Sequence, residues 1–178
     1  RLADSLNAGV NDSTLEGLSH AKHLRVLEMS NGLWTDRGLR HLGQISSLRE
    51  LNMFGGNVTS ATFVEHLPQT LTRLEVCAEF TDAFCEAVRD HLPNLRHLNI
   101  SACYRITNHG IGAVLSIDSL RILDMRQMRG LTDACIDSLL RAGKLERLDL
   151  RHNDFVTKQH ASQLQLALPK LTNLQFSE

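Results

Sequence analysis

Apolar residues recur along this 178-residue chain in one short pattern, Leu-x-x-Leu-x-apolar. Its seven copies follow one another every 23 to 26 residues, with their first leucines at Leu24, Leu48, Leu71, Leu95, Leu120, Leu145 and Leu171. The last two apolar residues of each copy are separated by one residue, which is the period of a strand with one buried face. The pattern therefore predicts a strand at every copy.

A helical pattern follows most of these strands. Five to nine residues after the motif, a Thr with a second polar residue precedes apolar residues at helical spacing, and such short side chains cap the free N–H groups of a first helical turn. The expected helix starts are Thr35-Asp36, Thr59-Ser60, Thr81-Asp82, Thr107-Asn108, Thr132-Asp133 and the less well formed Thr157-Lys158. Because proline disfavours continuation of a helix, we expect helix ends just before the three prolines, Pro68, Pro93 and Pro169.

One strand and one helix in each period of 23 to 26 residues is the pattern of an α/β leucine-rich-repeat solenoid, with a concave parallel sheet and convex helices. We divide the single domain, 1–178, into a partial repeat (1–23), six full repeats (24–170) and the strand of a truncated last repeat (171–178). The strand of the first repeat is expected to be degenerate or absent. Neither end has a polar capping repeat, so we expect that the native chain continues or that another protein covers the ends.

Two repeats carry a more specific pattern. The stretch from Leu95 to Ile111 reads Leu-x-x-Leu-x-Ile-x-x-Cys-x-x-Ile-Thr-Asn-x-Gly-Ile, with Cys103 at its centre, and Leu120 to Leu139 repeats it with Met128 in place of the Cys. This pattern resembles the cysteine-containing repeats of F-box/leucine-rich-repeat proteins. Elsewhere the cysteine position holds Gly32, Gly56 and Asn153. The first full repeats are also shorter before their Thr, so we expect uneven curvature.

The resemblance implies a role as the substrate-recognition arc of an F-box-type ubiquitin ligase adaptor, with the ligase core as a further partner. In that family the ligase docks on a separate helical F-box before the repeats, and no such segment is visible here. Two alternatives stay open. The chain could be a structural scaffold subunit of a large assembly, such as a ciliary, axonemal or mitochondrial complex, with neighbours in that complex as partners, or part of an enzyme whose catalytic segment lies outside it.

Residues that alternate with the leucines are expected to form an exposed concave face that binds a protein partner. The middle position of every motif is a carboxylate or an amide, which suits basic and amide groups of a partner. The predicted binding residues are Glu28, Glu50, Asn52, Phe54, Arg73, Glu75, His97, Asn99, Asp124, Arg126, Arg147, Asp149 and Arg151.

The alternative for this acceptor column is that its residues are ordinary solvated strand positions, with Asp124 paired to Arg126 and Asp149 paired to Arg151. Phe54 favours the binding interpretation because an aromatic side chain on that face has no place in the core.

Composition narrows the possible partners. Lys and Arg (19) nearly balance Asp and Glu (20), so no overall field attracts nucleic acid or an anionic membrane. The local arginines at 121, 126, 129 and 147 lack interleaved aromatic residues, which argues against nucleic acid. No apolar run approaches the roughly 20 residues of a membrane span, so no membrane insertion is expected.

The sequence indicates no bond chemistry, and we expect no cofactor, metal or catalytic residue. Only His20 and His23 share helical spacing, without further ligands to complete a metal site. Cys77 is expected to face outward, whereas Cys103 and Trp34 are expected to be buried. The four cysteines have no C-x-x-C spacing, which favours free thiols in a reducing compartment, and hence an intracellular, cytoplasmic protein.

Overall fold

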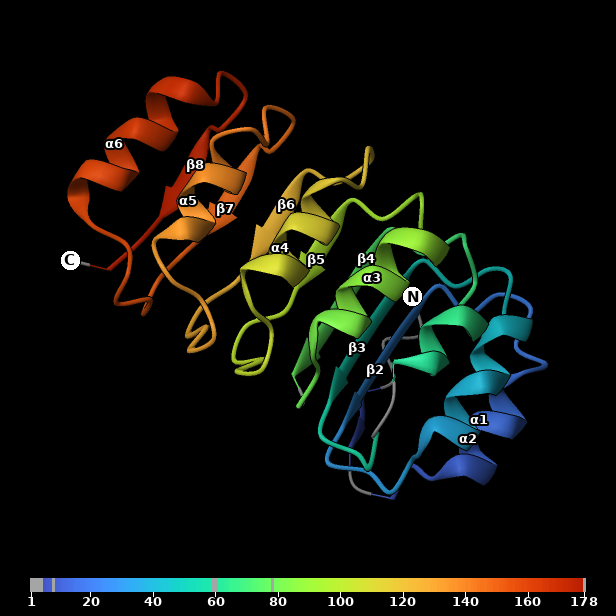
Figure 1. Cartoon of the computed structure of the whole chain (residues 1–178). Helices are drawn as coiled ribbons and strands as arrows, with labels where there is room; N and C mark the ends of the chain where they lie inside the picture. Colours follow the sequence, from blue (N-terminus) through green and yellow to red (C-terminus); the bar gives the residue numbers. More distant parts are fainter. Residues whose placement is uncertain (1–4, 8, 59–60, 78, 178) are drawn as a thin grey trace.

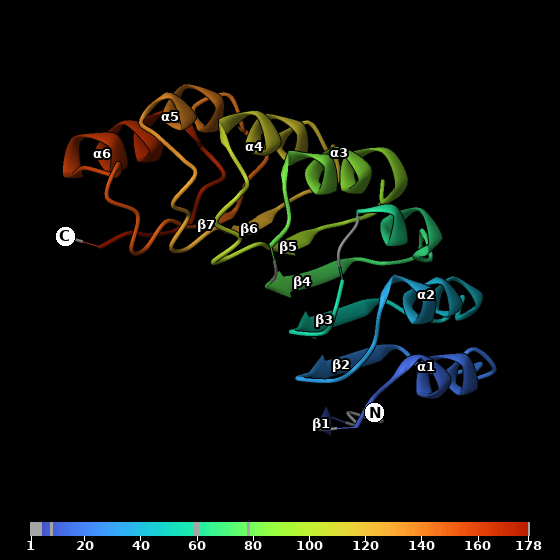
Figure 2. The ribbon, with the colours of Figure 1, turned by 60° about the horizontal axis from the view of Figure 1, so that its bottom comes forward.

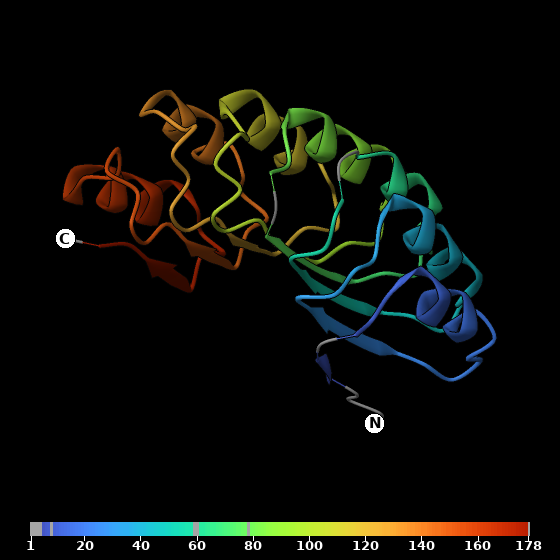
Figure 3. The ribbon, with the colours of Figure 1, turned by 90° about the horizontal axis from the view of Figure 1, so that it is seen from below.

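The computed structural model describes residues 5–7, 9–58, 61–77 and 79–177, and within them eight parallel strands form one sheet. Each strand pairs with the next one along the chain. In Figures 1, 2 and 3 the strands line the inside of an arc and the helices cover its outside. The strands are β1 (Ser5–Asn7), β2 (Val26–Ser30), β3 (Glu50–Phe54), β4 (Arg73–Cys77), β5 (His97–Asn99), β6 (Ile122–Asp124), β7 (Arg147–Asp149) and β8 (Asn173–Gln175). The predicted concave parallel sheet with convex helices is confirmed.

The convex layer consists of short helices. They are α1 (Asp12–Leu18), α2 (Asp36–Leu39), the 3-10 helices η1 (Arg40–Gln44) and η2 (Thr62–His66), α3 (Asp82–His91), α4 (Asn108–Leu115), α5 (Ala134–Leu139) and α6 (Lys158–Ala167). The starts of α2, α3, α4 and α6 agree with the predicted Thr caps, and η2, α3 and α6 end within two residues of a proline. The start of α5, at Ala134, is one residue late, and the side chain of Asp133 before it makes no capping hydrogen bond.

The first and third repeats differ from the expected pattern. The strand expected to be degenerate or absent exists as the three-residue β1, which pairs in register with β2. The Thr59-Ser60 helix start lies outside the described residues, and the helical segment described between β3 and Pro68 is the 3-10 helix η2. This repeat is the shortest of the array, so less chain is left for its convex side.

The core lies between the two layers and contains most of the motif leucines, together with apolar residues of the helices and loops. Three phenylalanines add bulk beside the short η2: the rings of Phe80 and Phe84 stack with centroids 4.3 Å apart, and Phe63 lies 5.8 Å from Phe80. All three are buried. Aromatic area therefore compensates for the missing helical turn.

Trp34 is fully buried, as predicted, and its ring accounts for two glycines. A side-chain carbon on Gly32 or on Gly56 would overlap that ring. These glycines hold the cysteine position of two consecutive repeats, so one indole fills a space that two side chains would otherwise share. The indole Nε1 has no hydrogen-bond partner among the described residues.

Asn153 holds the same position near the other end of the array, where it joins two repeats by hydrogen bonds. Its Nδ2 donates to the carbonyls of Met125 (2.8 Å) and Leu150 (2.9 Å), and its Oδ1 accepts from the N–H of Met128 (2.7 Å). The side chain is buried, so these backbone groups have no water to replace it. Cys103 makes a long contact with the Val76 carbonyl, at 3.9 Å.

The polar residue after the Thr or Asn that precedes a helix has a second role that the sequence did not reveal. Asp12 accepts from both the N–H and the hydroxyl of Thr35 in the next repeat, each at 2.8 Å. Asp82 does the same for Thr107, at 2.7 and 2.6 Å. Asn108 repeats the arrangement with Thr132, and there its Nδ2 donates to the hydroxyl. These clasps tie successive helix starts together.

Burial raises the pKa of Asp12, but the hydrogen bonds from Thr35 and Gly38 and the charge of Arg37 outweigh burial and hold this pKa below its usual value. A lowered carboxyl pKa stabilises the folded state above the unfolded pKa, and this contribution disappears as pH falls through the folded value. The first clasp is therefore sensitive to acid.

Replacing Asn153 tests the joint between the last repeats. Asn153→Ala leaves two carbonyls and one N–H buried without partners, so we expect the free energy of unfolding to fall by about 3 kcal/mol. Urea denaturation followed by circular dichroism measures this change. The exposed Asn57 gives the control Asn57→Ala, and equal stabilities of the two variants would contradict the assignment.

Replacing Asp12 by Asn separates charge from shape, since Asn108 already serves as a neutral clasp. Asp12→Asn should melt at a lower temperature than the native protein at pH 7. The gap should narrow as pH falls below about 4 and close once pH lies below the lowered pKa of the native Asp12 carboxyl. Thermal melting across pH measures both. Asp154→Asn, at an exposed carboxylate, is the control, and a gap independent of pH would refute the role of the charge.

Candidate protein-binding surface

The strand register places every predicted binding residue on the concave side in one of three columns. The first column is Val26, Glu50, Arg73, His97, Ile122, Arg147 and Asn173, and the middle column is Glu28, Asn52, Glu75, Asn99, Asp124, Asp149 and Gln175. The rim column begins with Ser30, Phe54 and Cys77 and continues, beyond the ends of the shorter strands, with Ser101, Arg126, Arg151 and Ser177. Their joint role in binding a partner stays a prediction.

The middle column is less solvated than the sequence suggests. Glu75, Asn99, Asp124 and Asp149 are all less than a tenth exposed, and so is His97 in the first column. Long arginine and histidine side chains from the flanking columns bond to the carboxylates and cover them. The expectation of an open row of acceptors is therefore wrong over this stretch.

Asp124 is buried and pairs with side chains from both neighbouring strands. Its Oδ2 lies 2.9 Å from His97 Nε2 on β5, and its Oδ1 lies 3.4 Å from Arg147 Nη2 on β7. Burial raises the pKa of Asp124, but the hydrogen bond and charge of His97, with the charges of Arg147 and Arg126, outweigh it and hold this pKa below its usual value. The carboxylate stays ionised and joins three strands.

Asp149 contacts both of the arginines that were expected to pair with two different aspartates. Arg151 forms the predicted pair with it, at 2.6 Å from Nη2 to Oδ2. Arg126, expected to pair with Asp124, instead has its Nε 3.7 Å from Asp149. Because Arg151 already binds both oxygens of Asp149, Arg126 is left with a loose contact. Its guanidinium nitrogens have no hydrogen bond recorded among the described residues.

In the N-terminal part of the concave face, carboxylates and not arginines are left without a partner of opposite charge within the described ranges. Arg73 pairs with Glu75 on the same strand. Glu28 receives a weak hydrogen bond from Asn52, at 3.4 Å, and neither Glu28 nor Glu50 contacts a cation in the described part of the chain. The concave face is therefore negative near β2 and β3 and positive past the end of β6.

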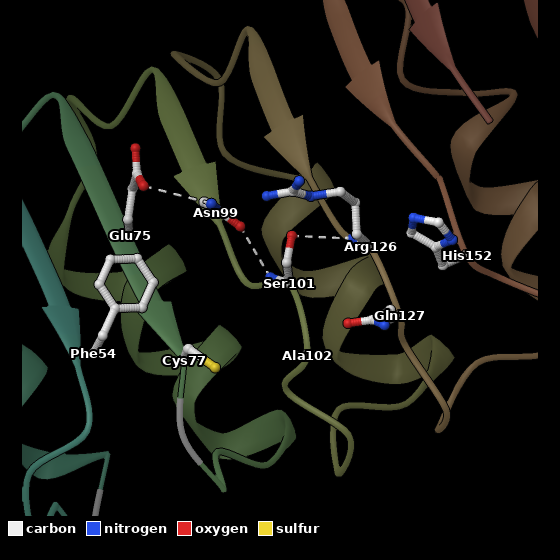
Figure 4. A pocket seen from close by; sticks show the side chains of 9 residues that line it. All are labelled: Phe54, Glu75, Cys77, Asn99, Ser101, Ala102, Arg126, Gln127 and His152. Atoms are coloured by element: carbon white, nitrogen blue, oxygen red, sulfur yellow. Dashed lines mark hydrogen bonds between the residues drawn. The ribbon is translucent and has the colours of Figure 1, made fainter. Parts of the chain in front are cut away.

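A pocket of about 450 Å³ opens on the rim side of this face, between β3 and the turn after β7. Figure 4 shows Phe54 and Cys77 on one side and Arg126 and His152 on the other, with Asn99 and Ser101 between them. The Phe54 side chain is 38% exposed although it is aromatic. The full lining is Phe54, Glu75, Cys77, Asn99, Ser101, Ala102, Arg126, Gln127 and His152.

Three residues of the pocket wall have a left-handed backbone. The φ angles of Ala102, Gln127 and His152 are 61°, 54° and 60°, and each follows a rim residue directly. Gly55 occupies the equivalent place after Phe54 with a φ of 83°. A side chain costs about 1 kcal/mol at such an angle, and glycine would avoid it. Sequence reasoning missed Ala102 and Gln127, although their place directly after the rim column was available as a signal.

The pocket presents hydrogen-bonding groups and charge more than reactive groups. Burial, and then the charge of Glu79, raises the pKa of the Cys77 thiol, which makes it a poor nucleophile. Among the described residues no group of three His, Cys, Asp or Glu side chains could hold a metal ion. Within the same residues no helix is long and apolar enough to cross a membrane. All four cysteines are free thiols, and Cys103 is buried as predicted.

Comparison with known proteins identifies the fold and gives weak sequence relatives. No family model matches the chain. Lysine-specific demethylase 2B of Mus musculus is 28% identical over 90 residues, which is 48% of this chain and 7% of that protein. The chain thus corresponds to a small part of this curated relative.

Solved structures cover far more of the chain. A chain in the crystal structure of the yeast Rad7 and Elc1 complex has a TM-score of 0.64 and 18% identity, over 93% of this chain and 53% of that one. An internalin of Listeria monocytogenes has a TM-score of 0.60 and 16% identity, over 92% and 51%. The tropomodulin C-terminal domain of Caenorhabditis elegans has a TM-score of 0.52 and 10% identity, over 89% and 92%. With its strand register, this likeness makes the chain an α/β leucine-rich-repeat solenoid.

Proposed function

We propose that this solenoid is a protein-recognition module that binds a segment of its partner along the concave face. The exposed Phe54 ring at the mouth of the pocket carries the proposal, because it lies outside the core and would be dehydrated only by a ligand. The polar groups around the Phe54 ring would fix the orientation of the bound segment by hydrogen bonds. The sequence supports an intracellular, cytoplasmic setting with its free thiols.

Within this class we infer that the chain is the substrate-recognition arc of an F-box-type ubiquitin ligase adaptor. Two observations support this role. The repeat around Cys103 resembles the repeats of that family, and a structural neighbour was crystallised as part of a two-protein complex, Rad7 with Elc1. In this role the concave pocket holds the substrate, and the ligase core contacts another part of the protein.

A scaffold subunit is the second candidate, and two exposed leucines favour it. Leu33, in the loop after β2, is 70% exposed, and Leu166 on α6 is 87% exposed. Both lie outside the concave columns, and β2 and α6 stand near opposite ends of the array (Figure 1). Large apolar side chains in such places fit neighbours that pack against the ends of the arc.

Phe54→Ala tests recognition by the concave face. A partner is first captured by crosslinking in cells and then purified, and its affinity is measured by calorimetry. Loss of an aromatic anchor from a pocket should weaken binding about 30-fold. Leu166→Ala removes an equally exposed apolar side chain from the convex side and should leave the affinity unchanged. The reverse pattern would reject the concave face in favour of the scaffold role.

Depletion of the protein in cells separates the adaptor from the scaffold. An adaptor's partner should carry less ubiquitin and accumulate after depletion, and native protein but not Phe54→Ala should reverse this. A scaffold's partner should instead lose its place in a large complex on sucrose gradients, with its ubiquitin unchanged, and that result would overturn the adaptor role.

A further inference from the structure

The pocket has two chemically different ends. Phe54 and Cys77, at the ends of β3 and β4, form the less polar side of the pocket, and the Ala102 methyl group, after β5, lies toward its middle (Figure 4). At the other end Arg126 and His152 contribute nitrogen groups, with the Gln127 amide beside them (Figure 4). An apolar group and a polar one, held a fixed distance apart, would fill both ends.

The polar end is rich in donors that are not used within the protein. The guanidinium of Arg126 has only the loose contact to Asp149, which Arg151 already binds through both oxygens. The Ser101 hydroxyl oxygen accepts from the backbone N–H of Arg126, at 3.1 Å, so its hydrogen is directed elsewhere. A carboxylate accepts from both kinds of donor and matches the planar guanidinium with two parallel bonds.

The opposite charge stands beyond the less polar side of the pocket. Glu28 lies on the strand next to Phe54, two residues back from the register partner Ser30, and it has no cation beside it in the part of the chain that the structure describes. The face thus offers an acidic, an apolar and a basic station in that order across the strands. A segment with the complementary order would bind in one direction only.

We propose that the pocket binds an extended protein segment in which an apolar side chain on Phe54 is followed by an Asp or Glu carboxylate on Arg126. A Lys or Arg on the other side of the apolar residue pairs with Glu28. The inference rests on the proposed function, because it assigns the chemistry of the segment that the concave face recognises. Arg126 selects the carboxylate, and Phe54 supplies the apolar anchor.

The strand spacing sets the distance between these side chains. Phe54 and Arg126 stand in the rim column three strands apart, which is about 14 Å or about four extended residues. Glu28 lies about 8 Å from Phe54, or about two extended residues, by the same spacings. The expected pattern is basic, apolar and acidic, with the longer gap before the acidic residue.

Left-handed turns position part of the pocket wall. Ala102, Gln127 and His152 all have this backbone conformation and line the pocket. Asn31 has the same conformation directly after the rim residue Ser30 and does not line the pocket, so the turn is a feature of the repeat that the pocket uses.

Selection from a displayed library of random 12-residue peptides tests the proposal. Peptides selected on the native protein should be enriched in Asp or Glu about four residues beyond an apolar residue. On Arg126→Glu the enrichment should change to Lys or Arg at that same place. Synthetic peptides from the first selection should bind Arg126→Glu at least 10-fold more weakly. Arg141→Glu, at an exposed arginine outside the pocket, is the matched control and should bind like the native protein.

The outcomes separate this inference from the proposed function. Peptides that lose affinity with Phe54→Ala but show no acidic preference would refute the Arg126 assignment and leave concave recognition standing. Peptides unaffected by both substitutions would count against both. A library that yields no peptide dependent on Arg126 also overturns the inference. Thermal melting of each variant confirms that it is folded, since Arg151 still pairs with Asp149 when Arg126 is replaced.

Discussion

Each repeat of this protein exposes its layer of leucines unless a neighbouring repeat covers it, and the rest of the structure depends on that constraint. A single strand and helix bury too little apolar area to offset the entropy of ordering them. Stability therefore resides in the joints between repeats. The joints have three parts here: the parallel ladder of the sheet, the clasps such as Asp12 with Thr35, and the packing at the cysteine position. Because the joints fix the register, they also bring distant residues into straight columns on the concave face.

The fold could be predicted from the sequence because its determinants recur. The leucine spacing gives the strands, the Thr pairs give most helix starts, and the prolines mark helix ends. The exceptions have local causes. The η2 repeat has less chain for its convex side, and phenylalanines from neighbouring segments fill the space. The Trp34 ring fills the space that side chains at Gly32 and Gly56 would need. Because these residues belong to two repeats, the pattern of a single repeat does not predict this packing.

The candidate surface was predicted less fully. Register alone places Phe54 and the carboxylates on one face, since alternation along a strand is strict. Which arginine pairs with which aspartate depends on side-chain paths across neighbouring strands. Asp149 has Arg151 from its own repeat and Arg126 from the repeat before, whereas Asp124 binds His97 and Arg147. The burial of these carboxylates follows from that pairing. Because Arg151 binds both oxygens of Asp149, Arg126 makes only a long contact with the same carboxylate.

The Trp34 ring has a consequence for how the array comes apart. Asn153 joins one pair of repeats, so the contact between these two repeats does not depend on the contacts at other boundaries. Trp34 instead occupies the space beside the glycines of two repeats, so neither can leave without opening a large void in the other. The N-terminal part of the arc therefore unfolds as a block, whereas the C-terminal part can fray one repeat at a time. A ligand that contacts both Phe54 and Arg126 would connect the N-terminal part, which unfolds cooperatively, to the C-terminal part, and would reduce fraying of the C-terminal repeats.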